Sequence, residues 1–465
     1  MLNEGASLSL KPKSTRYDLV VIGSGPGGHR AAVTAAKLGQ KVLIIEKDRM
    51  GGACLHLGTI PSKALREAAL GSETGATWIH EILSRTHQLI DEERVITEEH
   101  FHRNQIEAMI GTGSLVGPNR IRIECRNENF EVDSRYIVIA TGTRPRRPSE
   151  IPFDEEVIFE SDSILRLKTQ PKTILVLGAG VIGCEYASIF ARMGVKVTLV
   201  DSRPELLGTI DREIVEALSK QFEKSGVDLY LGAKFDQLKK CDRRGVKAAS
   251  VRLTCGDRVE EREFDAVLYC LGRTGNHEQL GLASVGIAPD GRGQIPVNSN
   301  YQTAIPNIYA VGDIIGAPAL AASSSEQGRL AVLHAFTGEK AEFPDTFPYG
   351  IYTIPEISSV GMQEAQLIAK NVKYVVGKAP YRILARGKMV GDEFGFLKLL
   401  VHSRTRRIVG VHVIGTSATE LVHIGQVAMA FGATVDFFVD NVFNYPTLAE
   451  AYKVAALNAE NKLGR

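Results

Sequence analysis

Two copies of one glycine pattern constrain the fold of this chain more than any other feature. In the first copy, the apolar run YDLVVI at residues 17–22 is followed by GSGPGG, by a helical stretch that stops at Gly39 and by an apolar run that ends at Glu46. In the second copy, the same order of strand, G-x-G-x-x-G turn, helix with Gly194 as its stop, and strand ends at Asp201. This order is typical of a βαβ unit, so we predict two dinucleotide-binding folds.

Each glycine of the pattern has a separate physical role. The first permits the tight turn, the second lets the backbone approach a pyrophosphate, and the third lets helix and strand pack closely. The helix N-terminus adds unpaired N–H groups and the positive end of its dipole, and the acid after the second strand accepts hydrogen bonds from ribose hydroxyls. We therefore assign dinucleotide binding to two sets of residues: Gly23, Gly25, Gly28 and Glu46, and Gly178, Gly180, Gly183 and Asp201.

Two dinucleotides in one chain imply that electrons pass between them, and hydride exchange between a flavin and a nicotinamide is the obvious reason. At the second site, Asp201 favours NAD because a carboxylate repels a 2′-phosphate. Arg203 favours NADP because a guanidinium pairs with that phosphate. The mixture is typical of an enzyme that accepts both nucleotides. The alternative is that Asp201 caps a turn and Arg203 is solvated.

Composition and charge exclude several classes of protein. The 465 residues, 44% of them hydrophobic, suffice for about two to four domains. A formal net charge of +1 from well-mixed charges argues against nucleic acid or a membrane surface as the main partner. No apolar run reaches the ~18 residues of a membrane span, and the six scattered cysteines lack metal-ligand spacing. We expect a cytoplasmic protein with reduced thiols and no metal.

The rest of the chain alternates between strands and helices. Apolar runs predict further strands, at 136–142, 266–276 and 301–313. Residues 62–110 favour helices, with Trp78 packed among them. From about Phe347 the pattern changes, and we expect a third domain, an antiparallel sheet with helices at 363–370 and 417–431.

Five motifs follow one another in an order known from one family: GSGPGG, GGACLHLGTIPSK, ATG, GAGVIGCE and YAVGD. On these motifs the chain resembles the flavoprotein disulfide reductases, such as dihydrolipoamide dehydrogenase and glutathione reductase, over about residues 16–460. The resemblance implies an α/β fold with two Rossmann-like dinucleotide-binding domains and a C-terminal α+β dimerisation domain. It also implies one FAD per chain in the first domain, NAD(H) or NADP(H) in the second, and a homodimer or larger homo-oligomer.

The implied domains can be placed along the chain. Residues 1–15 lack the apolar core of a signal peptide, so we expect a mobile tail, with a cleaved organelle peptide as the alternative. The domains that follow are the first part of the FAD-binding domain at 16–152, the NAD(P)-binding domain at 153–277, the second part of the FAD-binding domain at 278–345 and the dimerisation domain at 346–465.

The resemblance also implies site residues. Asp313 would accept a hydrogen bond from the flavin ribitol, and four residues would line the dinucleotides on the flavin side: Gly113, Thr141, Gly142 and Ala321. Three more would line the nicotinamide side: Gly272, Arg273 and Asn276. Cys54 would be a spare thiol at the flavin. His56 would either tune the flavin or Cys54, or be an ordinary packed histidine.

Lys63 would stand beside the flavin N5 atom and pair with Glu185. The physics agrees, because a cation beside the ring favours the electron-rich reduced flavin, and a buried lysine needs an anionic partner. The alternative is an ordinary surface pair.

The chain departs from the family at the two parts that serve disulfide chemistry. Thr59 replaces the flavin-proximal cysteine, and Tyr445 replaces the C-terminal histidine, while Pro446 and Glu450 remain. An unperturbed tyrosine titrates near ~10 and is a poor base at neutral pH. We expect the Tyr445–Pro446 bond to be cis, as in the family, which would aim Tyr445 at the partner's flavin.

One branch of the family, the soluble pyridine-nucleotide transhydrogenases, carries the same replacements. Cys54, His56 and Thr59 match its first segment, and NYPT at 444–447 matches its second. This resemblance implies hydride transfer between NADPH and NAD⁺ through FAD, with one nicotinamide pocket serving both nucleotides in turn. Three alternatives remain open: an NAD(P)H:quinone or dye reductase, a dihydrolipoamide dehydrogenase, and a non-catalytic FAD-binding scaffold.

Overall fold

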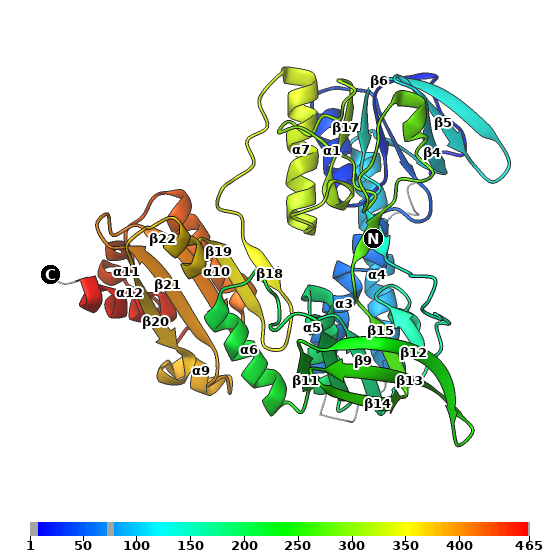
Figure 1. Ribbon diagram of the computed structural model, residues 1–465. Helices are drawn as coiled ribbons and strands as arrows, with labels where there is room; N and C mark the ends of the chain where they lie inside the picture. Colours follow the sequence, from blue (N-terminus) through cyan, green and yellow to red (C-terminus); the bar gives the residue numbers. More distant parts are fainter. Residues whose placement is uncertain (1–7, 72–78, 464–465) are drawn as a thin grey trace.

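The first glycine pattern lies in a seven-stranded sheet at the top of Figure 1. The computed structural model describes residues 8–71 and 79–463, so Trp78 lies outside the described residues. The strands of this sheet are β3 (Glu107–Ile110), β2 (Val42–Glu46), β1 (Arg16–Ile22), β6 (Asn129–Ile139), β5 (Arg120–Glu124) and β4 (Thr112–Gly117) in spatial order, with β17 (Ile308–Ala310) paired to β6. β1 pairs in parallel with β2 and β6, whereas β4 and β5 are antiparallel.

The parallel part of this sheet explains the continuous apolar runs. Leu19, Val20 and Val21 are fully buried, because both faces of the strand are covered. Leu19 and Val21 pack among residues of α1, whereas Val20 packs on the other face among residues of β4 and β5. Helices α1 (Pro26–Lys37) and α7 (Ala321–Thr337) lie side by side next to the sheet (Figure 1). α1 ends two residues before Gly39, which adopts a φ of 74°, as its predicted role as a helix stop requires.

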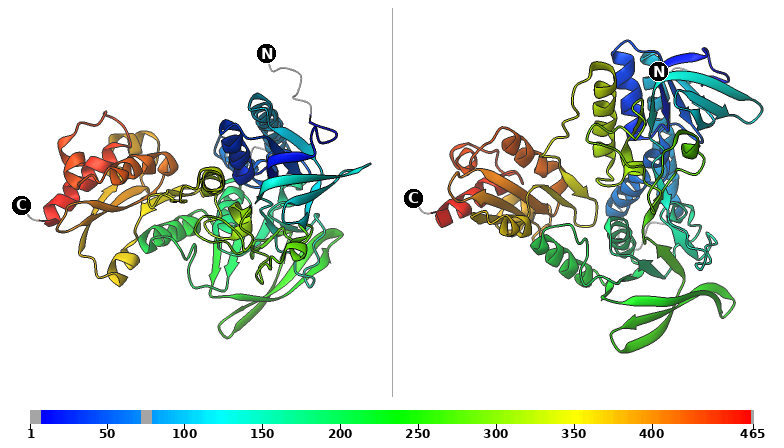
Figure 2. Two further views of the ribbon diagram at one scale, coloured as in Figure 1. Left: turned by 90° about the horizontal axis from the view of Figure 1, so that it is seen from above. Right: turned by 45° about the horizontal axis from the view of Figure 1, so that its top comes forward.

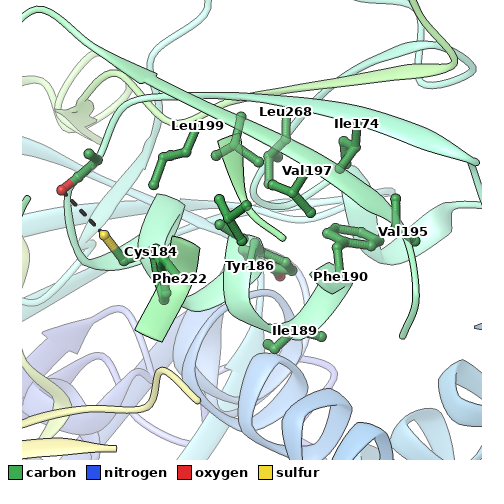
Figure 3. Packing of buried hydrophobic residues seen from close by; sticks show 14 of the residues in the cluster. Ile174, Cys184, Tyr186, Ile189, Phe190, Val195, Val197, Leu199, Phe222 and Leu268 are labelled. Carbon is green, nitrogen blue, oxygen red and sulfur yellow. Dashed lines mark hydrogen bonds between the residues drawn. The ribbon is translucent and has the colours of Figure 1, made fainter. Parts of the chain in front are cut away.

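The second glycine pattern lies in a five-stranded parallel sheet. Its spatial order is β11 (Asp228–Leu231), β10 (Lys196–Asp201), β9 (Thr173–Leu177), β15 (Ala266–Tyr269) and β8 (Ile158–Glu160). Helix α5 (Val181–Arg192) covers it, and its residues Tyr186 and Phe190 pack with Val197 and Leu268 of the sheet, as Figure 3 shows. This core gives the second nucleotide turn a rigid support.

The C-terminal part is a five-stranded antiparallel sheet, as predicted. Its order is β18 (Tyr349–Ile351), β19 (Ile357–Gly361), β22 (Ile408–Ile414), β21 (Phe396–His402) and β20 (Tyr374–Pro380). The predicted helices occur as α8 (Glu364–Ala369) and α10 (Ala418–Ala430). Three further helices were not predicted: α9 (Ala385–Met389), α11 (Val435–Asp440) and the long α12 (Glu450–Leu463). The views in Figure 2 show this part standing beside the other two.

Smaller elements connect the three parts. Helices α2 (Gly52–His56), α3 (Thr59–Gly71) and α4 (Ile79–Arg103) follow β2, and α6 (Arg212–Lys224) follows β10. An unpredicted antiparallel sheet consists of β12 (Lys234–Arg243), β13 (Val246–Cys255) and β14 (Arg258–Phe264). A two-stranded ribbon pairs β7 (Thr143–Pro145) with β16 (Arg273–Gly275). The described residues also form four short 3₁₀ helices: η1 (Ile164–Arg166), η2 (Leu282–Val285), η3 (Gly312–Ile315) and η4 (Tyr381–Ile383).

Two expectations about local structure need correction. The helical stretch at 62–110 ends early, because 107–110 are the edge strand β3. The tail expected at 1–15 is attached to that same strand from residue 8 onward. Ser9 N donates to Ala108 O at 2.9 Å, and Lys13 N donates to Glu107 Oε1 at 2.7 Å. An exposed sheet edge offers unpaired backbone groups, and Ser9 occupies one of them, whereas Lys13 binds a side chain of the same strand.

Candidate active site

The first glycine turn joins β1 to α1 and leaves room for a ligand. Gly23 has a φ of 103°, which favours glycine. A Cβ at Gly28 would lie 1.9 Å from Gly23 O, so no side chain fits there, whereas a Cβ at Gly25 would meet no atom within 4 Å. No side chain caps the N-terminus of α1. The turn therefore presents open backbone and a helix dipole, which suit a pyrophosphate.

The second turn, between β9 and α5, repeats this geometry. Gly178 has a φ of 108°, and a Cβ at Gly183 would lie 1.8 Å from Gly178 O. A Cβ at Gly180 would again meet open space, and no side chain caps α5. Both predicted dinucleotide turns are therefore built in the same way, at the C-terminal ends of parallel strands.

The acids that follow the two patterns also occupy equivalent positions. Glu46 Oε2 accepts hydrogen bonds from Ser24 N at 2.9 Å and Ser24 Oγ at 2.7 Å. Asp201 Oδ2 accepts from Ala179 N at 2.6 Å. Each carboxylate therefore holds the residue after the first glycine of its own turn. Ser24 also accepts from Gly51 N at 2.9 Å, which ties the turn to α2; the sequence analysis missed Ser24.

Asp201 and Arg203 form an ion pair at the second turn. Arg203 donates to Asp201 from its backbone N at 2.8 Å, from Nε at 3.0 Å and from Nη2 at 2.6 Å. Burial works to raise the pKa of Asp201, but the hydrogen bonds from Arg203 and Ala179 lower it below its ordinary value. The carboxylate is therefore charged at neutral pH. The guanidinium is half exposed, so it is held at the mouth of the site and is not simply solvated.

Cys54 and Thr59 lie on consecutive helices. Cys54 is part of α2, and Thr59 is the first residue of α3. Burial raises the pKa of the Cys54 thiol, although a hydrogen bond with the Thr59 side chain works to lower it. All six cysteines, Cys54 included, are free. The thiol therefore has a hydroxyl as its neighbour where a disulfide reductase needs a second sulfur.

Lys63 and Glu185 form the predicted pair. Lys63 Nζ on α3 lies 2.7 Å from Glu185 Oε2 on α5. The side chain of Glu185 is 6% exposed and that of Lys63 is 24% exposed, so the contact is not an ordinary surface pair. It joins the helix after the first glycine pattern to the helix of the second pattern, close to both turns.

Asp313 lies in η3, and two successive hydrogen bonds link it through Thr143 to Arg273. Thr143 Oγ1 donates to Asp313 Oδ2 at 3.4 Å, and Arg273 Nε donates to Thr143 Oγ1 at 2.8 Å. Burial raises the pKa of Asp313, while the charge of Arg273 opposes the shift. Thr143 was missed by the sequence analysis, although it directly follows the ATG motif.

Arg273 and Asn276, which we expected on the nicotinamide side, both donate hydrogen bonds to the segment after β6, and Arg273 Nη1 also donates to Ser161 Oγ at 3.5 Å. Asn276 Nδ2 donates to Thr141 O and Thr141 Oγ1 donates to Asn276 O, both at 2.9 Å. Asn276 N donates to Gly142 O at 3.0 Å. These contacts join the two dinucleotide-binding parts, so Arg273 and Asn276 hold the crossover between them.

The remaining flavin candidates flank the first turn. Gly113 lies on β4 against Ile22 and Ile45, the side chains at the ends of β1 and β2. Ala321 is the first residue of α7, whose side contacts α1. Gly142 and Gly272 have φ values of 62° and 97° in the two strand-ending turns.

Tyr445 and Glu450 lie apart from this group. Tyr445 is 74% exposed on the C-terminal part, and its bond to Pro446 is cis, as predicted. Glu450 begins α12 and accepts from Thr447 N at 3.4 Å. The described chain by itself therefore brings Lys63, Glu185, Cys54, Thr59 and Asp313 together and leaves Tyr445 and Glu450 on another surface.

His56 agrees with the packed-histidine interpretation. It is buried, and its Nε2 lies 2.8 Å from Met50 O. Burial lowers the pKa of His56, so the ring is neutral at pH 7.

A cavity of about 890 Å³ between α2, α4 and residues 144–166 includes His56 in its lining. A second cavity, of about 360 Å³, adjoins the first glycine turn, and Ser24 and Cys54 are among the residues that line it.

A cluster of acids elsewhere has metal-like spacing but a different partner. Asp211, Glu213 and Glu364 place their carboxylates within 4.8 Å of one another. Lys398, which is fully buried, makes ion pairs with all three, among them one of 2.8 Å from Nζ to Asp211 Oδ1. The ammonium supplies the positive charge, and we assign no metal.

Among the described helices, none has the length and apolar character needed to cross a membrane.

Comparison with known proteins identifies the family. Residues 17–328 match the family model described as pyridine nucleotide-disulphide oxidoreductase, and residues 347–456 match its dimerisation domain. The chain is 46% identical over 464 residues to the soluble pyridine nucleotide transhydrogenase of Mycobacterium tuberculosis, covering 96% of this chain and 98% of that one. It is 42% identical to the enzyme of the same name from Citrobacter koseri, covering 97% and 100%.

Solved structures of related proteins have the same fold as this chain. The HOCl-induced flavoprotein disulfide reductase RclA from Escherichia coli superposes with a TM-score of 0.86 at 26% identity, covering 96% of this chain and 100% of that one. LpdA from Mycobacterium tuberculosis superposes with a TM-score of 0.87 at 27% identity, covering 97% and 100%. The predicted α/β fold with two dinucleotide-binding parts and a C-terminal dimerisation domain is confirmed. The chain belongs to the pyridine nucleotide-disulphide oxidoreductase family, whose members use a flavin and a pyridine nucleotide.

Proposed function

We propose that this enzyme transfers hydride between NADPH and NAD⁺ through one bound FAD, without a redox disulfide. The single observation that carries the proposal is Thr59 beside Cys54. The thiol has a hydroxyl neighbour, so no disulfide can store electrons there, while the Lys63–Glu185 pair and both glycine turns are intact. Relatives that match the chain over nearly its full length carry the name transhydrogenase, which supports this choice.

The residues of the first turn fit FAD. The space at Gly25 and the open end of α1 suit the pyrophosphate, and Glu46 and Asp313 are the carboxylates for the ribose and ribitol hydroxyls. FAD supplies a ring that accepts a hydride and returns it. Lys63 would hold its positive charge beside that ring, and Glu185 would keep the lysine oriented.

One nicotinamide pocket at the second turn would serve both substrates in sequence. Arg203 would swing from Asp201 to the 2′-phosphate of NADPH, and Asp201 would accept from the 2′-hydroxyl of NAD⁺. The ion pair that these residues form with each other is consistent with such an exchange. The mechanism is then ping-pong, because the oxidised nucleotide must leave before the second nucleotide enters.

We further propose a cytoplasmic homodimer, with Tyr445 and Glu450 facing the partner's flavin. Several apolar side chains at α10, at α11 and in the segment before α12 are exposed: Val427, Phe431, Phe437, Val442 and Tyr445. A patch of this kind marks an interface. Phe431→Glu is expected to give a monomer in sedimentation analysis, whereas Val259→Glu, at an exposed apolar position on β14, leaves the dimer intact. A dimeric Phe431→Glu protein would refute this interface.

The test of the activity uses the purified holoenzyme, NADPH and a thionicotinamide analogue of NAD⁺. We expect the reduced thio-analogue to form with no other acceptor present. Double-reciprocal plots should be parallel, and high NAD⁺ should inhibit competitively against NADPH. A protein that passes electrons from NADPH only to a quinone or dye would instead be a reductase of the same fold. Intersecting lines would require two nicotinamide sites.

A further inference from the structure

A short segment of the C-terminal part crosses the helices that carry the Lys63–Glu185 pair. Ile354 N donates to Ser188 Oγ on α5 at 3.1 Å. Arg66 on α3 donates from Nε to Thr353 O at 3.0 Å and from Nη2 to Glu356 Oε1 at 3.0 Å. The segment is therefore fixed to both helices next to the site.

The same segment is anchored in its own part of the protein. Glu356 Oε2 accepts from Thr419 N at 3.1 Å and from Thr419 Oγ1 at 2.8 Å, on α10. Arg66 has a side chain only 5% exposed, so its bonds to this segment are shielded from water. The position of residues 352–356 is consequently determined on both sides, and a side chain on it can orient a neighbour.

Tyr352 is the residue of this segment that contacts the pair. Its backbone N donates to Glu185 Oε1 at 2.9 Å, the oxygen that Lys63 does not use. Its ring centre lies 4.9 Å from Lys63 Nζ, which is within cation–π range. Lys63 Nζ also donates to Ser62 Oγ at 3.3 Å. The ammonium is therefore held between a carboxylate and an aromatic face.

We propose that Tyr352 is a positioning residue for hydride transfer, which fixes Lys63 through its ring and Glu185 through its backbone N–H. The proposal rests on the proposed role of Lys63 beside the flavin. The ring packs against the ammonium and, together with Glu185, restricts the direction of the long lysine side chain. Burial raises the pKa of Tyr352, so its phenol stays neutral and adds no second anion beside Glu185.

The test compares Tyr352→Leu with Tyr352→Phe. Leucine keeps the backbone N–H and removes the ring, and phenylalanine keeps both. Tyr136→Leu is the matched control. Tyr136 is also half-buried and also lies next to a cation, because its ring centre is 5.1 Å from Arg135 Cζ, but it belongs to β6. Thermal unfolding shows that each variant is folded before it is compared.

The first measurement uses apoprotein and an amine-modifying reagent, with Lys63 modification followed by peptide mass spectrometry. Losing a cation–π contact of ~0.5–1 kcal/mol should raise the modification rate of Lys63 about two- to fivefold in Tyr352→Leu. Tyr352→Phe and Tyr136→Leu should stay within about twofold of the wild type. An unchanged rate in Tyr352→Leu would overturn the inference.

The second measurement follows flavin reduction by NADPH in the holoenzyme and the flavin midpoint potential. We expect Tyr352→Leu to lower both the rate of flavin reduction and the midpoint potential. Tyr352→Phe should keep the wild-type values. Equal losses in Tyr352→Leu and Tyr352→Phe would show that the ring does not act on Lys63 and would overturn the inference. If Lys63→Met itself leaves both values unchanged, the proposed role of Lys63 fails, while a raised modification rate still supports the contact with Tyr352.

Discussion

Lys63 Nζ lies 2.7 Å from Glu185 Oε2, although the two residues are 122 positions apart and belong to helices of different dinucleotide-binding parts. The contact places a charge of one part against a carboxylate of the other. It therefore links the position of the two nucleotide turns to the geometry of the flavin site.

Removing one partner of this pair should destabilise the protein. Lys63→Met leaves Glu185 nearly buried, with the Tyr352 N–H as its one remaining donor among the described residues, so we expect a loss of roughly 2–3 kcal/mol in the free energy of unfolding at pH 7, below the ~3–5 kcal/mol of a fully buried pair. The double variant Lys63→Met/Glu185→Gln should recover most of it. Arg212→Ala, in an exposed pair with Glu216, should change little. Additive losses in urea unfolding would contradict this coupling.

Restoring one sulfur should not restore disulfide chemistry. In Thr59→Cys, two thiols stand on α2 and α3, but Tyr445 still cannot act as the base that dihydrolipoamide oxidation needs. We expect negligible dihydrolipoamide:NAD⁺ activity in steady-state assays. The double variant Thr59→Cys/Tyr445→His is the matched comparison and should exceed it. Substantial activity of the single variant would show that Tyr445 is not a second obstacle.

Arg203 should favour binding of NADPH over NAD⁺ at the second nucleotide turn. Its loss removes a charged hydrogen bond to the 2′-phosphate, worth ~1.5–3 kcal/mol, so Arg203→Ala should slow the NADPH half-reaction about 10- to 100-fold and spare the NAD⁺ half-reaction. Asp201→Ala should weaken the NAD⁺ half-reaction and also loosen the turn, because Ala179 N loses its acceptor. Stopped-flow measurement of the two half-reactions separates these effects, with Arg212→Ala as control. Equal damage to both halves would rule out the sorting role.

Low pH should weaken the ion pair between Asp211 and Lys398, because it protonates the Asp211 carboxylate. Burial works to raise the pKa of Asp211, but the charge of His412 and the hydrogen bond from Lys398 lower it below 3.8. A lowered folded-state pKa stabilises the protein above the ordinary value, and this stabilisation is lost as the pH falls through the folded-state value. Asp211→Asn, which can still cap α6, should therefore lose less stability between neutral pH and pH values below 3.8 in urea unfolding. Glu216→Gln should behave like the wild type, and an unchanged pH dependence in Asp211→Asn would refute this assignment.

The parts of the site that are local in sequence could be predicted. The glycine turns and the acids Glu46 and Asp201 belong to βαβ units, where about 20 residues determine the geometry. The Lys63–Glu185 pair could be foreseen only through the family resemblance, because no local pattern joins α3 to α5.

Other contacts left no readable signal. Tyr352 reaches Glu185 across 167 residues, and its segment reads simply as a strand interrupted by Pro355. The sheet β12–β14 is rich in charges at both faces, so its alternation was weak. Ser9 and Lys13 bind β3 through backbone groups, which side-chain patterns do not reveal.

The central claim is that hydride passes through the flavin in two half-reactions with no disulfide, and an anaerobic titration of the holoenzyme tests it most directly. NADPH should bleach the flavin and NAD⁺ should restore its oxidised spectrum, with no long-wavelength thiolate-to-flavin band at any stage. Dithionite should stop at two electrons per flavin. Uptake of four electrons, or a flavin that NADPH reduces but NAD⁺ does not reoxidise, would contradict the account.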